Sequence, residues 1–164
     1  MNLLSFLRAW HLLGLLFILF GCGDSSPKLP LAGLKVEFGP HNVPAEMVAG
    51  EMLLADIAIK NASTKTWPSK PNQKGTNAVN LSYHWLDRRR QMMVFDGLRT
   101  PLPRDLNPGE SVTLRAAIRA PEKAGAYLFQ VTMVQEGVAW FSDSDGGQLS
   151  IPVVVAASAL QGER

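Results

Sequence analysis

Apolar and polar residues alternate along most of the chain between residues 34 and 155. A period of two places successive side chains on opposite faces, which is typical of β-strands with one buried face. The pattern predicts strands over residues 34–38, 51–61, 77–86, 91–95, 111–119, 127–135, 138–141 and 148–155. Clusters of Gly, Pro, Asn and Asp separate these strands. Seven or eight strands of this kind predict an all-β sandwich of antiparallel sheets.

The alternation also predicts which side chains face the core. In the third predicted strand, the outer face carries Asn80, Ser82 and His84, which we expect to lie in solvent, so that losing the His84 ring should cost little stability. On the inner face, Trp85 is expected to pack between the two sheets, where a large aromatic side chain contributes much of the buried apolar area. Tyr127 follows a glycine turn at the start of a late strand, so we expect it to form a tyrosine corner.

The first 21 residues differ from the rest of the chain. Arg8 precedes an apolar run over residues 9–20, which is shorter than the roughly 20 residues needed to span a bilayer but has the length of a signal-peptide core. We expect four segments. They are a signal peptide over residues 1–21, a flexible polar tether over 22–33, the β-sandwich over 34–155 and a C-terminal tail over 156–164.

The end of the apolar run resembles the lipobox of bacterial lipoproteins. It reads Leu19-Phe20-Gly21-Cys22, and Cys22 is the only cysteine in the chain. The resemblance implies that Cys22 becomes the acylated first residue of the mature protein. It therefore implies a lipoprotein anchored in a membrane of the bacterial cell envelope, with the leaflet left open. Several acyl chains anchor durably, since each buried methylene contributes about 0.8 kcal/mol.

Composition and charge exclude several kinds of partner and ligand. The formal net charge is only +2, without the concentrated basic surface of nucleic-acid-binding proteins, so we expect no nucleic-acid partner. A single cysteine excludes an intrachain disulfide and a zinc site made of several thiolates. Asp143 and Asp145 are similar to the opening of a calcium loop, but no terminal Glu completes it, and a plain Asp-Gly turn explains them equally well. We expect no cofactor and leave calcium open.

Several motifs resemble immunoglobulin-like domains of bacterial envelope proteins. They are the strand IAIKNAS, the loop TWPSKP, the strand LSYHWLD, the segment RTPLPRDLNPGE and the two strands of AGAYLFQVTMVQEGVAWF. Similar modules are appended to bacterial glycosyltransferases and methyltransferases, and the polysaccharide-recognising domain of O-antigen exporters is a more distant relative. The resemblance covers residues 34–155. It implies an immunoglobulin-like β-sandwich of about seven or eight antiparallel strands that binds or spaces rather than catalyses.

Candidate catalytic residues are few. His84 and Ser82 share a strand face two positions apart, where Asp87 or Asp96 would orient the imidazole of a Ser–His pair. No nucleophile elbow or oxyanion loop accompanies these residues, and a solvated sheet face explains them as well. We therefore expect that the protein is not an enzyme.

Binding residues are expected on loops, because a rigid scaffold usually presents its ligand-contacting residues there. The predicted loops carry aromatic and basic side chains that together suit an acidic glycan, namely Trp67, Arg88, Arg89, Arg90, Trp140 and Phe141. Core packing for the aromatics and a solvated turn for the arginines are the alternatives. We predict a lipid-anchored, non-enzymatic binding or scaffold domain for envelope polysaccharide or a partner protein. The second possibility is a protease-inhibitor-like or chaperone-like module that acts through loops or edge strands.

Overall fold

The structure is a computed structural model that describes residues 34–143 and 146–158 of the chain. Within these residues it consists of β-strands and one short 3-10 helix over Phe141–Asp143. The strands are β1 (Val36–His41), β2 (Glu46–Val48), β3 (Met52–Asn61), β4 (Val79–Asp87), β5 (Met92–Val94), β6 (Thr100–Pro101), β7 (Ser111–Arg119), β8 (Gly125–Gln135), β9 (Ala139–Trp140) and β10 (Gln148–Ala156). The predicted signal peptide, Cys22 and most of the predicted tail lie outside the described residues, as does Asp145 of the calcium candidate.

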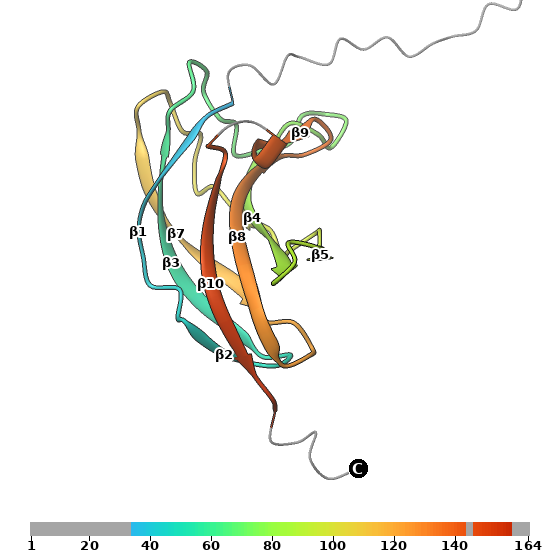
Figure 1. Cartoon of the computed structure of the whole chain (residues 1–164). Helices are drawn as coiled ribbons and strands as arrows, with labels where there is room; N and C mark the ends of the chain where they lie inside the picture. The colour runs from blue at the N-terminus through green and yellow to red at the C-terminus, as the bar shows by residue number, and fades with distance from the viewer. Residues whose placement is uncertain (1–33, 144–145, 159–164) are drawn as a thin grey trace, which may run out of the picture.

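The strands form two sheets that face each other (Figure 1). The smaller sheet has the order β1-β3-β7 and is antiparallel throughout. The larger sheet has the order β2-β10-β8-β4-β5, with β6 beside β4 and β9 beside β8. Its pairings are also antiparallel, except that β2 runs parallel to β10. In immunoglobulin lettering these are an A-B-E sheet and a G-F-C sheet, so the predicted immunoglobulin-like β-sandwich is confirmed.

The space between the sheets holds the apolar side chains that the alternation assigned to it. Trp85 is fully buried there, and its ring lies 4.7 Å from that of Phe129 and 5.9 Å from that of Tyr127, measured between ring centroids. The indole N–H of Trp85 also donates to the carbonyl of Arg119 on β7, at 3.0 Å. The prediction for Trp85 is therefore confirmed, and the residue joins the two sheets by packing and by a hydrogen bond.

Tyr127 forms the predicted tyrosine corner. Its hydroxyl donates to the backbone carbonyl of Lys123, four residues earlier in the chain, at 2.9 Å. The bond closes the turn between β7 and β8 in the manner of immunoglobulin folds. No helix in the part of the chain that the structure describes has the length and apolarity needed to cross a bilayer.

Candidate functional site

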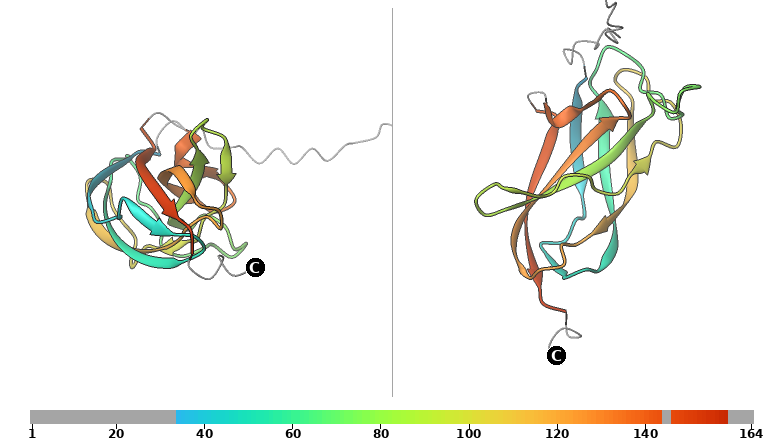
Figure 2. Two further views of the ribbon diagram at one scale, coloured as in Figure 1. Left: turned by 60° about the horizontal axis from the view of Figure 1, so that its bottom comes forward. Right: turned by 90° about the vertical axis from the view of Figure 1, so that its right-hand side faces the viewer.

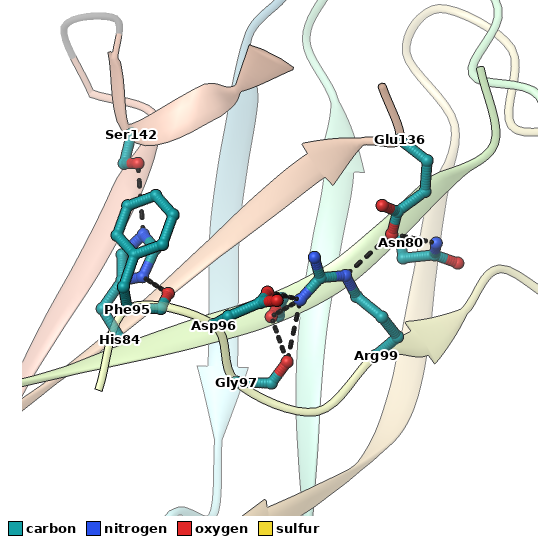
Figure 3. Close-up of polar contacts among 9 residues, drawn as sticks. Asn80, His84, Phe95, Asp96, Gly97, Arg99, Glu136 and Ser142 are labelled. Atoms are coloured by element: carbon teal, nitrogen blue, oxygen red, sulfur yellow. Dashed lines mark hydrogen bonds and ion pairs between the residues drawn. The ribbon is translucent and has the colours of Figure 1, made fainter. Parts of the chain in front are cut away.

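The outer face of the larger sheet is covered where β4 and β8 pair. Ser82 and His84 of β4 are fully buried, and so is Thr132 on β8. The prediction that Ser82 and His84 lie in solvent is therefore wrong. Segments of this same chain lie over them, namely the stretch over residues 95–99 and the turn around Ser142 (Figure 3). Alternation determines the face of the sheet on which a side chain lies, but not what covers that face.

His84 holds two covering segments together. Its Nδ1 donates to the carbonyl of Phe95, and its Nε2 accepts from the hydroxyl of Ser142 at 3.4 Å (Figure 3). The imidazole stacks on the Phe95 ring at 5.0 Å and contacts the Trp140 ring at 4.5 Å, between centroids. Burial lowers the pKa of His84, and this effect outweighs the Phe95 carbonyl and the charge of Asp143, which both raise it. The ring is accordingly neutral at pH 7.

The Ser–His pair considered from the sequence is not formed. The hydroxyl of Ser82 donates to the carbonyl of Gly97 at 3.1 Å and accepts from Nη1 of Arg99 at 3.0 Å. Asp96 pairs with Arg99 at 2.5 Å instead of orienting the His84 ring. Ser82 is thus engaged in holding the chain around Gly97 against the sheet, rather than poised as a nucleophile.

Arg99 is the centre of the polar network around Ser82 and Asp96, and no motif in the sequence points to it. Its Nε pairs with Oε1 of Glu136 at 2.7 Å, and its guanidinium carbon lies 4.8 Å from the centre of the Trp140 ring. Asn80 donates to the same Glu136 oxygen at 2.9 Å (Figure 3). Burial disfavours the charge, but the hydrogen bonds to Glu136 and Asp96 outweigh it and raise the pKa of Arg99. Asp96 and Glu136 therefore already neutralise the charge of Arg99, so Arg99 holds the covering segment in place and is not a site for an anion. We call Arg99 and its partners Ser82, Asp96, Gly97 and Glu136 the clamp.

The clamp fixes the segment that returns from the β4–β5 hairpin. Gly97 lies so close to β4 that a Cβ atom there would be 2.5 Å from the carbonyl oxygen of Tyr83. Its own N–H donates to this carbonyl at 3.1 Å. Only a residue without a side chain lies this close to the sheet, and the hairpin is held at its base as a result.

The tip of the hairpin is a tight turn with three exposed arginines, Arg88, Arg89 and Arg90. Asp87, the other residue considered as a partner of the His84 ring, instead accepts from the backbone N–H groups of Arg89 and Gln91, both at 2.8 Å. The N–H of Arg90 closes the turn on the Asp87 carbonyl at 2.9 Å. Among the described residues, none of the three guanidinium groups forms an ion pair with a carboxylate.

Apolar side chains continue this exposed surface along the returning strand. Met92 is 45% exposed, Met93 50% and Phe95 55%. Together with Leu98, they make up four of the eight large apolar side chains that are exposed among the described residues. We call Arg88, Arg89, Arg90, Met92, Met93 and Phe95 the hairpin surface. Figures 1 and 2 show this hairpin standing out from the two-layered body of the sandwich.

The six predicted ligand-contacting residues do not form one patch. Trp67 and Phe141 are buried against each other in an edge-to-face contact at 5.3 Å, so they belong to the core and not to a stacking surface. The loop carrying Trp67 is drawn inward because its backbone pairs with that of Leu106, and its indole N–H donates to the Ser63 hydroxyl at 2.9 Å. Trp140 is half-buried beneath the Arg99 guanidinium. Of the six residues, only the three arginines are exposed.

Comparison with known proteins bears on the fold alone. No family model matches the chain, and no curated protein matches it. Among solved structures, a CARDB domain from Pyrococcus furiosus is 15% identical over 76% of this chain and 94% of that one, with a TM-score of 0.44. A human PapD-like domain is 11% identical over 94% and 98%, with a TM-score of 0.30.

A family 123 glycoside hydrolase from Clostridium perfringens is 13% identical over 69% of this chain, with a TM-score of 0.32, and this chain covers 22% of that enzyme. Likenesses as loose as these carry no argument about function, because one fold serves many functions. The assignment to the immunoglobulin-like sandwiches rests on the strand order described above.

Proposed function

We propose that the chain is a lipid-anchored, non-enzymatic binding module of the bacterial cell envelope, which contacts an anionic component of that envelope through the hairpin surface. The observation that carries the proposal is the hairpin surface itself. On a projecting hairpin, three arginines that form no ion pair among the described residues precede exposed methionine and phenylalanine side chains. Exposed apolar side chains beside basic ones are typical of an interaction surface, since the apolar side chains gain free energy by leaving water.

The polar residues on the outer face of β4 support a binding role more than a catalytic one. Ser82 is engaged by Gly97 and Arg99 and does not contact His84. The Ser142 hydroxyl contacts Nε2 of His84 at 3.4 Å, but the other ring nitrogen is bonded to the Phe95 carbonyl and not to a carboxylate that would orient a catalytic base. Among the described residues, every buried side-chain nitrogen or oxygen has a hydrogen-bond partner. The shifted pKa values of His84 and Arg99 are therefore explained by the burial and the polar contacts that position the hairpin, and they do not require a catalytic role.

The anchor is supported by the lipobox-like sequence ending at Cys22. Residues 23–33 connect Cys22 to the sandwich, and a fully extended chain of this length reaches about 40 Å. An anchored domain on so short a connection stays near the membrane surface, where the effective concentration of envelope components is high.

The anchor is tested by labelling cells with a fatty-acid analogue. The wild-type protein is expected to incorporate the label and to fractionate with membranes, whereas Cys22→Ser loses the label and leaves the membrane fraction or remains an unprocessed precursor. Equal labelling of the two proteins would exclude the lipoprotein assignment. Binding is tested separately, by incubating the unacylated chain with washed envelope fractions and comparing it with Arg88→Ala/Arg89→Ala/Arg90→Ala.

A protease-inhibitor-like or chaperone-like module is the second candidate function. The projecting hairpin favours it, because a rigid loop held at its base is suited to enter a cleft of another protein. A single co-purifying protein whose retention depends on the three arginines, with no retention by envelope polysaccharide or lipid, would favour this function over the first.

A further inference from the structure

We propose that the hairpin surface docks the sandwich onto an anionic phospholipid bilayer, so that the domain lies against the membrane instead of extending away from it. The inference rests on the proposed function and names the envelope component that the hairpin contacts. It follows from the chemistry of the surface, from the way the hairpin is held and from the proximity that an anchor at Cys22 would impose.

The chemistry of the surface matches the headgroup region of a bilayer. Arg88, Arg89 and Arg90 supply positive charge at the tip, and Met92 and Met93 follow closely in the chain as flexible, exposed apolar side chains. Basic residues near an anionic bilayer are attracted to its surface potential, while apolar side chains gain by leaving water for the boundary with the acyl chains. Two of the aromatic side chains that were expected to stack on a glycan, Trp67 and Phe141, are instead buried in the core.

The local charge balance favours an anionic occupant. The hairpin contains one carboxylate between residues 87 and 95, and that group, on Asp87, is engaged by two backbone N–H groups of the turn. The next acidic residue, Asp96, is paired with Arg99. Residues 87–95 therefore carry three positive charges and one negative charge, and among the described residues none of the three guanidinium groups is in an ion pair.

The hairpin is also held in one position before it meets a surface. Val94 pairs with Trp85 and Met92 pairs with Leu86 across the two strands. One face of the Phe95 ring stacks on His84, while the residue remains half exposed. Less conformational entropy is lost on docking when the docking element is ordered in advance, which makes a small surface effective.

An anchor at Cys22 makes even weak docking effective. With the sandwich confined within about 40 Å of the bilayer, the second contact becomes intramolecular and its effective concentration reaches the millimolar range. Three basic residues alone would bind free protein only weakly to a membrane, but they would keep an anchored domain on it for most of the time.

The test uses the chain from residue 23 onward, which has no acyl group and contains all of the described strands and core. It is sedimented with vesicles of phosphatidylcholine that contain phosphatidylglycerol, and with vesicles of phosphatidylcholine alone. Binding is expected only to the first, and added salt is expected to weaken it because exposed charges are screened. Arg88→Ala/Arg89→Ala/Arg90→Ala should weaken binding about 100-fold, and Met92→Ser/Met93→Ser about tenfold.

The matched control is Lys65→Ala/Lys70→Ala/Lys74→Ala, which removes the same charge from another exposed loop and should bind as the wild type does. Unchanged melting temperatures show that the variants are folded. Absence of binding to the phosphatidylglycerol vesicles at low salt, or an equal loss in the lysine control, would overturn the inference. Arginine-dependent binding to lipid-free envelope polysaccharide or protein, without vesicle binding, would overturn it too but would leave the proposed function standing.

Discussion

The two faces of β4 are buried to nearly the same extent by opposite means. The inner face carries Leu81 and Trp85 and is covered by apolar side chains of the facing sheet. The outer face carries Ser82 and His84 and is covered by two segments of the chain that are held by hydrogen bonds and an Arg99–Glu136 ion pair. Apolar packing on the inner face requires no particular orientation of the side chains. On the outer face, each polar group has a defined hydrogen-bond or ion-pair partner.

The two faces of β4 therefore contribute differently to the fold. Apolar burial stabilises the fold in proportion to area and tolerates rearrangement, because it needs no particular alignment. A buried polar contact contributes modestly when it is satisfied and costs much more when one partner is lost. The inner face therefore supplies most of the stability, and the outer face determines where the β4–β5 hairpin stands.

The largest effect is expected from Trp85→Ala on the inner face. Emptying the site of a buried large aromatic ring costs about 3–5 kcal/mol, a large part of the total stability of about 5–15 kcal/mol. The loss also removes the hydrogen bond from the indole N–H to the carbonyl of Arg119. Urea denaturation followed by circular dichroism measures the change in the free energy of unfolding. A loss below about 1 kcal/mol would contradict the conclusion that the inner face supplies most of the stability.

A smaller but more local effect is expected from His84→Ala on the outer face. It leaves the Phe95 carbonyl and the Ser142 hydroxyl without their partner, so we expect a loss of about 2 kcal/mol, not the negligible loss expected for a solvated residue. Amide hydrogen exchange should accelerate in residues 92–95 more than in β3 or β7. Uniform acceleration across both sheets would mean that His84 supports the whole fold and not the hairpin.

The sequence predicted the inner face of the sandwich well because that face depends only on local alternation. Trp85 and Tyr127 took their predicted places, since a period of two and a glycine turn determine them within a few residues. Both placements depend only on the sequence of a short segment, and not on contacts with distant parts of the chain.

The outer face could not be predicted in this way because its cover comes from distant parts of the chain. Ser142 is 58 residues from His84, and Glu136 is 37 residues from Arg99. No spacing rule connects them, and the same residue types occur on solvated surfaces. Trp67 was misplaced for the same reason, since its loop is drawn into the core by pairing with Leu106. Met92 and Met93 do lie in the predicted strand, but alternation does not indicate that both side chains are exposed.

The smallest effect concerns the pH dependence of stability, and it tests the outer face alone. The pKa of His84 is lowered in the folded protein by burial, whereas in the unfolded chain it lies near 6.5. Below about pH 6.5 the unfolded chain binds a proton that the folded protein does not, so stability is full above this pH and decreases as the pH falls toward the folded-state pKa.

The charges around His84 act on it in both directions, since Asp143 and Asp96 raise its pKa and Arg99 lowers it, and burial prevails. His84→Gln keeps an amide donor for the Phe95 carbonyl but does not titrate. We expect the wild type to lose stability between pH 7 and about pH 5 relative to this variant, by at most about 1.4 kcal/mol per pH unit for a single proton. Urea titrations of both proteins across this range measure the difference. Parallel curves would mean that His84 titrates alike in the folded and unfolded chains, which would contradict a buried, neutral ring at the base of the hairpin.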